Sequence, residues 1–209
     1  MTLLRALLVW SACLLALGLP IAAAATSPLL QWRDPVYVSA GFAGIVAMGL
    51  LLVQPLLIGR YLPGLSTQLS RRLHRVVGTL LVVTVIFHVG ALWITSPPDV
   101  VDVLLFRSPT PFSAFGAIAM WAIFGAAILA AFRGRLKISH KRWRLAHSAF
   151  VTIAVICTVA HAALIEGTME TTTKFGLCAL VLLATGKVLV DLRVFGLLKQ
   201  SAITKRTGS

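Results

Sequence analysis

The chain has 209 residues, of which 58% are hydrophobic and only 12% charged, and its mean hydropathy is +0.93. This composition excludes a soluble globular domain and predicts an integral membrane protein, because each crossing needs about 20 apolar residues. The net charge of +13 comes from short Arg and Lys clusters beside apolar runs, a pattern typical of membrane topology signals and not of a nucleic-acid-binding surface.

Six apolar runs follow one another along the chain. The first, residues 3–25, carries one Arg near its start and ends in small residues, a pattern shared by membrane helices and cleavable signal peptides. We favour a retained helix and keep a cleaved signal as the alternative. The other runs lie at about residues 37–59, 73–95, 112–132, 145–165 and 175–198. We therefore expect an all-α membrane bundle of six helices, or of five if residues 1–25 are removed.

The connections between these runs alternate in charge. The loops at 59–73 and 133–144 carry Arg and Lys and no acidic residue, whereas the segment at 96–111 is close to neutral and EGTMETTTK is slightly acidic. Basic loops stay on the cytoplasmic side of a membrane. We therefore expect a multi-pass protein of the plasma (inner) membrane, with a cytoplasmic tail at 199–209 and both termini cytoplasmic if the first helix is retained. Within 96–111, the sequence VVDVLLF is expected to lie along the membrane surface.

Two of the apolar runs each carry two histidines fourteen residues apart, His74 with His88 and His147 with His161. On an α-helix this spacing falls about 40° short of four turns, so both histidines share one face, about 21 Å apart along the axis. Both helices are expected to run from the cytoplasm outwards. His74 then faces His147 near the inner surface, and His88 faces His161 near the outer one.

Two imidazoles on opposite sides of a flat macrocycle complete the coordination of a haem iron, and ionisable side chains are costly in lipid unless they are used. A single membrane histidine often bonds a backbone carbonyl instead. The repeated spacing on parallel helices, at equal offsets from basic clusters, favours two bis-histidine b-type haems, stacked along the membrane normal. His140 lies among charged residues and is not expected to be a ligand. Such haems have no free axial position, so we expect electron transfer and no catalytic residue in this chain.

The two histidine segments contain the sequences RRLHRVVG, with His88 downstream, and KRWRLAH, with His161 downstream. They resemble the ferric reductase-like transmembrane domain, shared by ferric reductases, NADPH oxidases and the haem-binding subunit of the bacterial methionine sulfoxide reductase system. The resemblance covers residues 37–198. It implies an inner haem iron on His74 and His147 and an outer haem iron on His88 and His161.

The same resemblance implies that electrons enter from a cytoplasmic flavin and leave to an acceptor outside, either ferric iron or a periplasmic or extracellular partner. The chain has no glycine-rich GxGxxG motif. The donor is therefore expected to be a separate flavin reductase or flavoprotein that supplies FMN or FAD. On this interpretation the chain is the electron-transfer subunit of an oxidoreductase.

Arginines precede the first histidine of each segment. Arg71, Arg72 and Arg144 are candidates for binding haem propionates or docking an acidic donor, besides their role in topology. Lys187 and Asp191, one helical turn apart, are expected to pair, with a propionate or quinone contact as the alternative. A quinol-linked di-haem cytochrome b, or a non-redox membrane protein with structural histidines, remains the alternative function.

Overall fold

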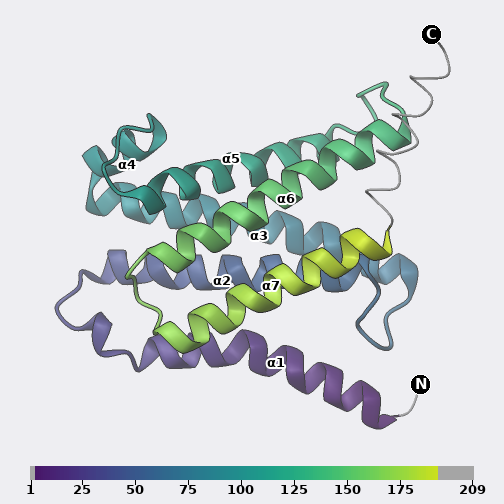
Figure 1. Cartoon of the computed structure of the whole chain (residues 1–209), viewed down its shortest axis with the longest axis horizontal. Coiled ribbons are helices and arrows are strands. Elements are labelled where there is room, and N and C mark those ends of the chain that lie inside the picture. The colour runs from purple at the N-terminus through teal and green to yellow at the C-terminus, as the bar shows by residue number, and fades with distance from the viewer. Residues whose placement is uncertain (1–2, 193–209) are drawn as a thin grey trace.

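The computed structural model describes residues 3–192 and contains helices but no β-strand in this range (Figure 1). The elements in chain order are α1 (Leu3–Ala25), the 3-10 helix η1 (Pro28–Leu30), α2 (Pro35–Ile58), α3 (Thr67–Thr95), α4 (Pro97–Leu104), α5 (Pro111–Ala131), α6 (His140–Leu164) and α7 (Thr171–Asp191). The predicted all-α fold is confirmed.

Six of these helices, all except η1 and α4, are long and apolar enough to cross a membrane. They have 21–29 residues, and their most apolar stretches reach mean hydropathies of 1.7–2.2. Many large apolar side chains point outwards: Leu8, Leu183 and Ile94 are 62%, 69% and 72% exposed. Soluble monomers rarely expose apolar surface on this scale. The chain is therefore a multi-pass membrane protein, with lipid covering these side chains.

The two histidine-bearing helices begin earlier than the apolar runs predicted, α3 at Thr67 and α6 at His140. In both cases a serine caps the helix. The Ser66 hydroxyl accepts a hydrogen bond from the Leu69 N–H at 3.2 Å, and the Ser139 hydroxyl accepts one from the Arg142 N–H at 3.4 Å. Hydropathy locates the apolar part of a helix, whereas the cap decides where the helix begins. Arg71 and Arg72 therefore lie in the early turns of α3, and Arg142 and Arg144 in those of α6.

Helix α7 also differs from the predicted span of 175–198, because it begins at Thr171 and ends at Asp191. The Glu170 carboxylate caps its start, accepting hydrogen bonds from the N–H groups of Thr172 and Thr173, both at 2.6 Å. These bonds, the one from Thr173 foremost, hold the pKa of Glu170 below its ordinary value. Residues 193–198 and the predicted tail at 199–209 lie outside the described residues.

The bundle is organised around two antiparallel helix pairs, α2 with α3 and α5 with α6, which make the most extensive interhelical contacts. Helix α7 packs against α2 and α6, and α1 lies against α2 and α7 (Figure 1). Short α4 connects α3 to α5 and contacts both. The core between the helices includes Met48, Leu81, Met120, Ala154 and the fully buried Val181.

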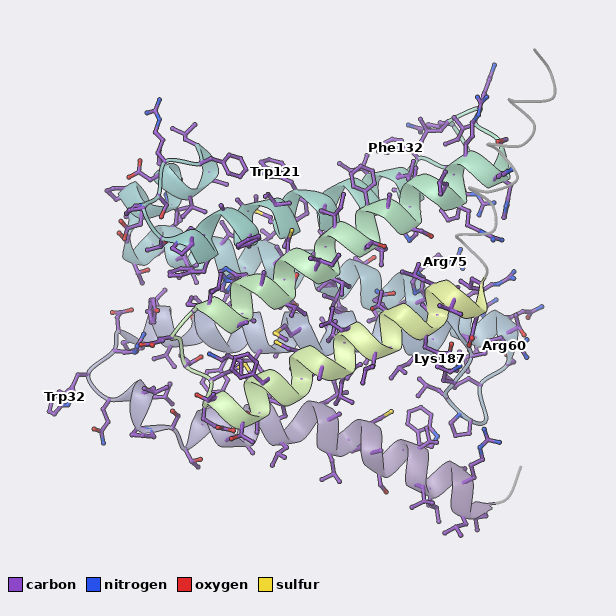
Figure 2. The ribbon with its side chains drawn as sticks, viewed as in Figure 1. Trp32, Arg60, Arg75, Trp121, Phe132 and Lys187 are labelled. Atoms are coloured by element: carbon purple, nitrogen blue, oxygen red, sulfur yellow. The ribbon has the colours of Figure 1, made fainter. Side chains whose placement is uncertain are left out.

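The long helices run along one common direction, so the bundle has two ends (Figure 1). Helices α3 and α6 begin at one of them, which we call the basic end; α3 and α6 finish at the other, the far end. Figure 2 shows Arg60, Arg75 and Lys187 at the basic end. It also shows Trp32, which is fully exposed, projecting from the far end.

Candidate haem-binding site

The four candidate ligands lie on the two parallel helices α3 and α6, at two levels of the bundle. His74 and His147 lie within the first turns of these helices, and we call them the basic-end pair. His88 and His161, fourteen residues further along each helix, form the far-end pair. His74 lies at the same level of the bundle as His147, and His88 at the same level as His161. The structure therefore brings the histidines together in the combinations that the spacing predicts.

In the far-end pair, each imidazole is bonded to the backbone of a neighbouring helix. Nδ1 of His88 lies 2.7 Å from the Ala40 carbonyl oxygen of α2, and Nδ1 of His161 lies 2.8 Å from the Phe112 carbonyl oxygen of α5. A carbonyl oxygen can only accept, so Nδ1 donates the hydrogen in both rings. In the neutral imidazole the lone pair then resides on Nε2, the arrangement found in most metal-ligating histidines.

The basic-end pair is held differently. Its Nδ1 atoms are buried, and within residues 3–192 neither has a hydrogen-bond partner. The backbones of Gln54 on α2 and Ala126 on α5 lie beside the rings of His74 and His147, but hydrogen-bond geometry is not reached. Along α2 and α5 these two positions are fourteen residues beyond Ala40 and Phe112. The spacing of the histidines is therefore matched by that of the backbone groups facing them.

An aromatic stack orients His147 instead. Its ring lies on the indole of Trp143, with centroids 5.2 Å apart and planes within 8° of parallel. The Arg133 guanidinium lies 4.3 Å from the centroid of the same indole, and Trp143 Nε1 donates a hydrogen bond to the Leu129 carbonyl at 3.1 Å. Trp143 therefore packs directly on a candidate ligand.

Glycines provide the space for the far-end rings. A Cβ added at Gly116 on α5 would lie 2.8 Å from Nδ1 of His161, closer than real Cβ atoms come to another atom. A Cβ added at Gly44 on α2 would lie 3.4 Å from Cε1 of His88, an ordinary close contact. Both glycines follow the residue that supplies the carbonyl acceptor by four positions, one helical turn. A side chain at position 116 would therefore force the His161 ring to shift.

These features agree with ligation by all four imidazoles. In the part of the chain that the structure describes, no Nε2 atom of the four rings is committed to a hydrogen bond, and at the far end the tautomer leaves that atom as the electron donor. A b-type haem takes one such nitrogen on each side of its iron. The residues present therefore fit two such groups, one at each level.

The predicted propionate-binding arginines occupy the basic end but differ in their surroundings. Arg71 and Arg72 are exposed in the second turn of α3. Arg144 is half-buried, and its Nη2 donates a hydrogen bond to the Leu192 carbonyl at the end of α7, at 2.9 Å. Its Nε is buried and has no partner among residues 3–192. Arg144 therefore has a structural bond, and a propionate contact stays a prediction for all three. His140, the first residue of α6, is exposed.

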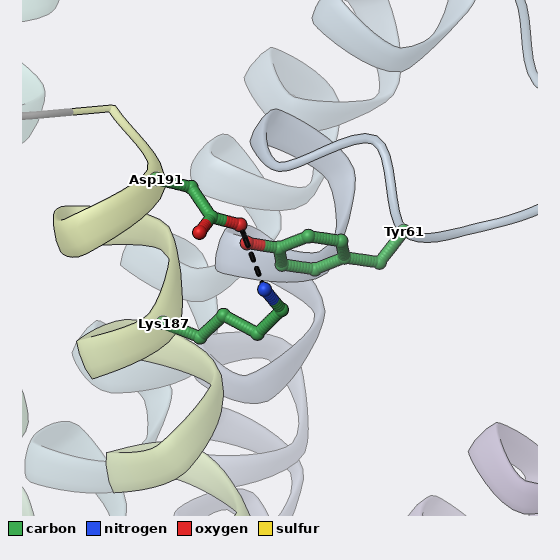
Figure 3. A network of polar contacts seen from close by, with 3 residues as sticks. All are labelled: Tyr61, Lys187 and Asp191. Carbon is green, nitrogen blue, oxygen red and sulfur yellow. Dashed lines mark hydrogen bonds and ion pairs between the residues drawn. The ribbon is translucent and has the colours of Figure 1, made fainter.

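The predicted pair of Lys187 and Asp191 is confirmed and includes a third member (Figure 3). Lys187 Nζ lies 2.9 Å from Oδ2 of Asp191, and the Tyr61 hydroxyl donates a hydrogen bond of 2.5 Å to the same oxygen. The ammonium also lies 5.2 Å from the centroid of the Tyr61 ring. These contacts tie the end of α7 to the loop after α2.

Sequence reasoning missed the residues that surround the histidines, Ala40 and Phe112 with their carbonyls and Gly44 and Gly116 with their open space. One signal could have found them. The sequence GIVAM at residues 44–48 recurs as GAIAM at residues 116–120, and His74 and His88 recur at nearly the same offset as His147 and His161. An internal repeat of the whole helix pair would have predicted which residues of α2 and α5 face the rings.

Comparison with known families gives one match. A model described as the ferric reductase like transmembrane component matches residues 43–158, more than half of the chain. This segment lies within the predicted domain of residues 37–198 and includes His74, His88 and His147. Comparisons with curated proteins and with solved structures give no match.

Proposed function

The chain belongs to the family of ferric reductase-like transmembrane components, and on that premise we propose that it is the electron-transfer subunit of a membrane oxidoreductase. In this proposal His74 and His147 hold one b-type haem, and His88 and His161 hold the other. When bound, each haem accepts and releases one electron at a time, without binding substrate at its iron. The observation that carries the proposal is that two facing histidine pairs leave all four Nε2 atoms uncommitted within the described residues.

The direction of transfer follows from the distribution of charge. The basic end carries exposed Arg71 and Arg72 together with the basic residues of the α5–α6 connection, and it suits an acidic donor protein. We assign this end to the cytoplasm and the protein to the plasma (inner) membrane. The donor is a reduced flavin or flavoprotein carrying FMN or FAD, which is oxidised by two electrons in two single-electron steps. The acceptor at the far end is ferric iron or a periplasmic or extracellular partner.

The chain's own residues position the ligands and exclude water. The Ala40 and Phe112 carbonyls hold the far-end rings with Nε2 available, and the Trp143 stack holds the His147 ring. The lipid-facing apolar surfaces of the helices keep the site out of water. A site without water limits the solvent reorganisation that accompanies each electron transfer.

The test is haem stoichiometry in the purified protein, measured by the pyridine haemochrome assay together with a redox titration. We expect two b haems per chain in the wild type and one in His74→Ala and in His88→Ala, with a different redox transition lost in each variant. His140→Ala is the matched control, because His140 is exposed at the start of α6, and it should retain both haems.

Three results would contradict the proposal: no haem in the wild type, one haem that both variants retain, or loss of haem in the His140→Ala control. Haem reduction that quinone-site inhibitors abolish would instead support the quinol-linked alternative.

A further inference from the structure

We propose that α2 and α5 act as templates for the far-end histidines, and that Gly116 is a positioning residue for His161. This inference rests on the proposed function only in assigning the rings to haem. The tautomer and the orientation of the two rings are properties of the protein and do not require a bound haem. The template at each helix is a carbonyl oxygen that accepts from Nδ1, and in α5 a glycine one turn later, Gly116, also leaves space for the ring.

The carbonyl component fixes the hydrogen position. The hydrogen bonds of 2.7 Å and 2.8 Å to Ala40 and Phe112 require the Nδ1–H tautomer in His88 and His161. A histidine that donates from Nδ1 to a carbonyl becomes a more basic ligand through Nε2. Greater ligand basicity favours the oxidised iron, so these bonds lower the reduction potential of a haem bound at the far end.

Each glycine leaves space for a histidine ring, and the space is smaller at Gly116 than at Gly44. At Gly116 an added methyl group would lie 2.8 Å from Nδ1 and 3.0 Å from Cε1 of His161, so it displaces the edge of the ring that bonds Phe112. At Gly44 the same methyl group would lie 3.4 Å from Cε1 and 3.5 Å from Nδ1 of His88. The equivalent substitution is therefore disruptive in α5 and tolerable in α2.

The histidine rings are therefore held in different ways at the two levels of the bundle. The far-end rings are oriented by backbone atoms of other helices before any ligand binds. The basic-end rings have no such bond within residues 3–192, and His147 depends on the Trp143 stack. The structure assigns tautomer selection to the far-end pair.

The experiment compares three alanine variants of the full-length chain, Gly116→Ala, Gly44→Ala and Gly125→Ala. Gly125 lies on the same helix as Gly116, and its added Cβ would lie 2.7 Å from Cε1 of Phe150, so the clash is equally severe but strikes no histidine. Two readouts are used on each protein. One is the ¹⁵N spectrum of labelled histidine, which reports the tautomer of each ring, and the other is redox titration with electron paramagnetic resonance.

In the wild type and in Gly44→Ala and Gly125→Ala, we expect His88 and His161 to carry the hydrogen on Nδ1. In Gly116→Ala we expect that signal to be lost for His161 alone. The haem that His88→Ala removes should be lost in Gly116→Ala, or titrate at a more positive potential with an altered low-spin signal. The other haem should not change.

An Nε2–H tautomer of His161 in the wild type overturns the inference, and so does a Gly116→Ala protein with an unchanged His161 signal. Equal effects of Gly116→Ala and Gly125→Ala on the His161 signal and on the haem would show that Gly116 acts only through general packing, and this result would also overturn the inference. If Gly116→Ala does not fold while Gly125→Ala does, the inference is judged on the wild-type protein: the Nδ1–H tautomer of His161 supports it, and the Nε2–H tautomer overturns it. A protein that lacks haem but shows both Nδ1–H tautomers defeats the proposed function and leaves the template intact.

Discussion

Tyr61 lies in the loop after α2, outside the membrane-spanning helices, and the pKa of its side chain is strongly raised. Burial raises the pKa of its phenol to about 12, with further contributions from the hydrogen bond to Asp191 and from the negative charge of that carboxylate. The ordinary value is 10.0. Because the folded state favours the neutral phenol, its contribution to stability is fully present below pH 10 and is lost as the pH rises towards 12.

This cluster gives a prediction at the residue scale. Asp191→Asn removes the negative charge, so the pKa of Tyr61 should fall part of the way towards 10, with the effect of burial remaining. The measurement is a spectrophotometric titration of tyrosinate in a Tyr37→Phe background, where Tyr61 is the only tyrosine. Lys187→Met retains Asp191 and serves as the control, with the raised pKa preserved. Identical titration curves for wild type and Asp191→Asn would show that the hydrogen bond is absent.

Residues differ in how far the sequence reveals them. The positions of the four histidines were predictable because α3 and α6 each carry two of them, and periodicity within one helix fixes the face that the two share. Tyr61 was not predictable, since its partner Asp191 is 130 residues away in the chain. Nothing in the local sequence of either residue indicates the other.

At the scale of elements, α6 and α7 cap each other. The Lys174 ammonium in the first turn of α7 donates to the carbonyl of Ile165, the C-cap of α6, at 3.0 Å. At the opposite end, Arg144 of α6 donates to the carbonyl of Leu192, the C-cap of α7, at 2.9 Å. Cations are favourable where helix carbonyls are left unpaired. Each helix thus stabilises the end of its antiparallel neighbour.

Lys174→Met should therefore destabilise the protein. Lys174 is only 7% exposed, and the loss of a hydrogen bond from a charged donor costs about 1.5–3 kcal/mol. Lys187→Met, on the same helix, is the matched control. Its ion pair is solvent-accessible, with side-chain exposures of 62% and 43%, so the expected loss of stability is smaller than for Lys174→Met. Thermal unfolding in detergent measures both, and equal midpoints would refute the capping role of Lys174.

At the scale of the whole molecule, the two histidine-bearing helix pairs are equivalent structures. Ser66 and Ser139 cap α3 and α6 in the same way. Thr79 and Thr152, each five residues after the first histidine of its helix, bond back to the carbonyls of Arg75 and Ser148 at 3.1 and 2.8 Å. The helix pairs α2–α3 and α5–α6 run in the same direction, so the basic clusters of both lie at one end of the bundle.

That orientation is testable by labelling with a membrane-impermeant maleimide. The background replaces Cys13, Cys157 and Cys178 with alanine. Single reporters are Gln68→Cys and Gly134→Cys at the basic end and Trp32→Cys and Arg107→Cys at the far end, all at exposed positions. In intact spheroplasts we expect only the far-end cysteines to react, and in inside-out vesicles only the basic-end ones. The reverse pattern would invert the proposed direction of electron transfer.

The sequence by itself determined the six membrane-length helices and the two histidine levels. Hydropathy and helical periodicity are properties of single segments, so they need no knowledge of neighbours. The tertiary structure alone decided which nitrogen of His88 and His161 bonds a carbonyl, and why a Cβ at position 116 would meet the His161 ring. Those features depend on which backbone carbonyl of α2 or α5 faces each ring, and only the packing of the helices fixes that contact.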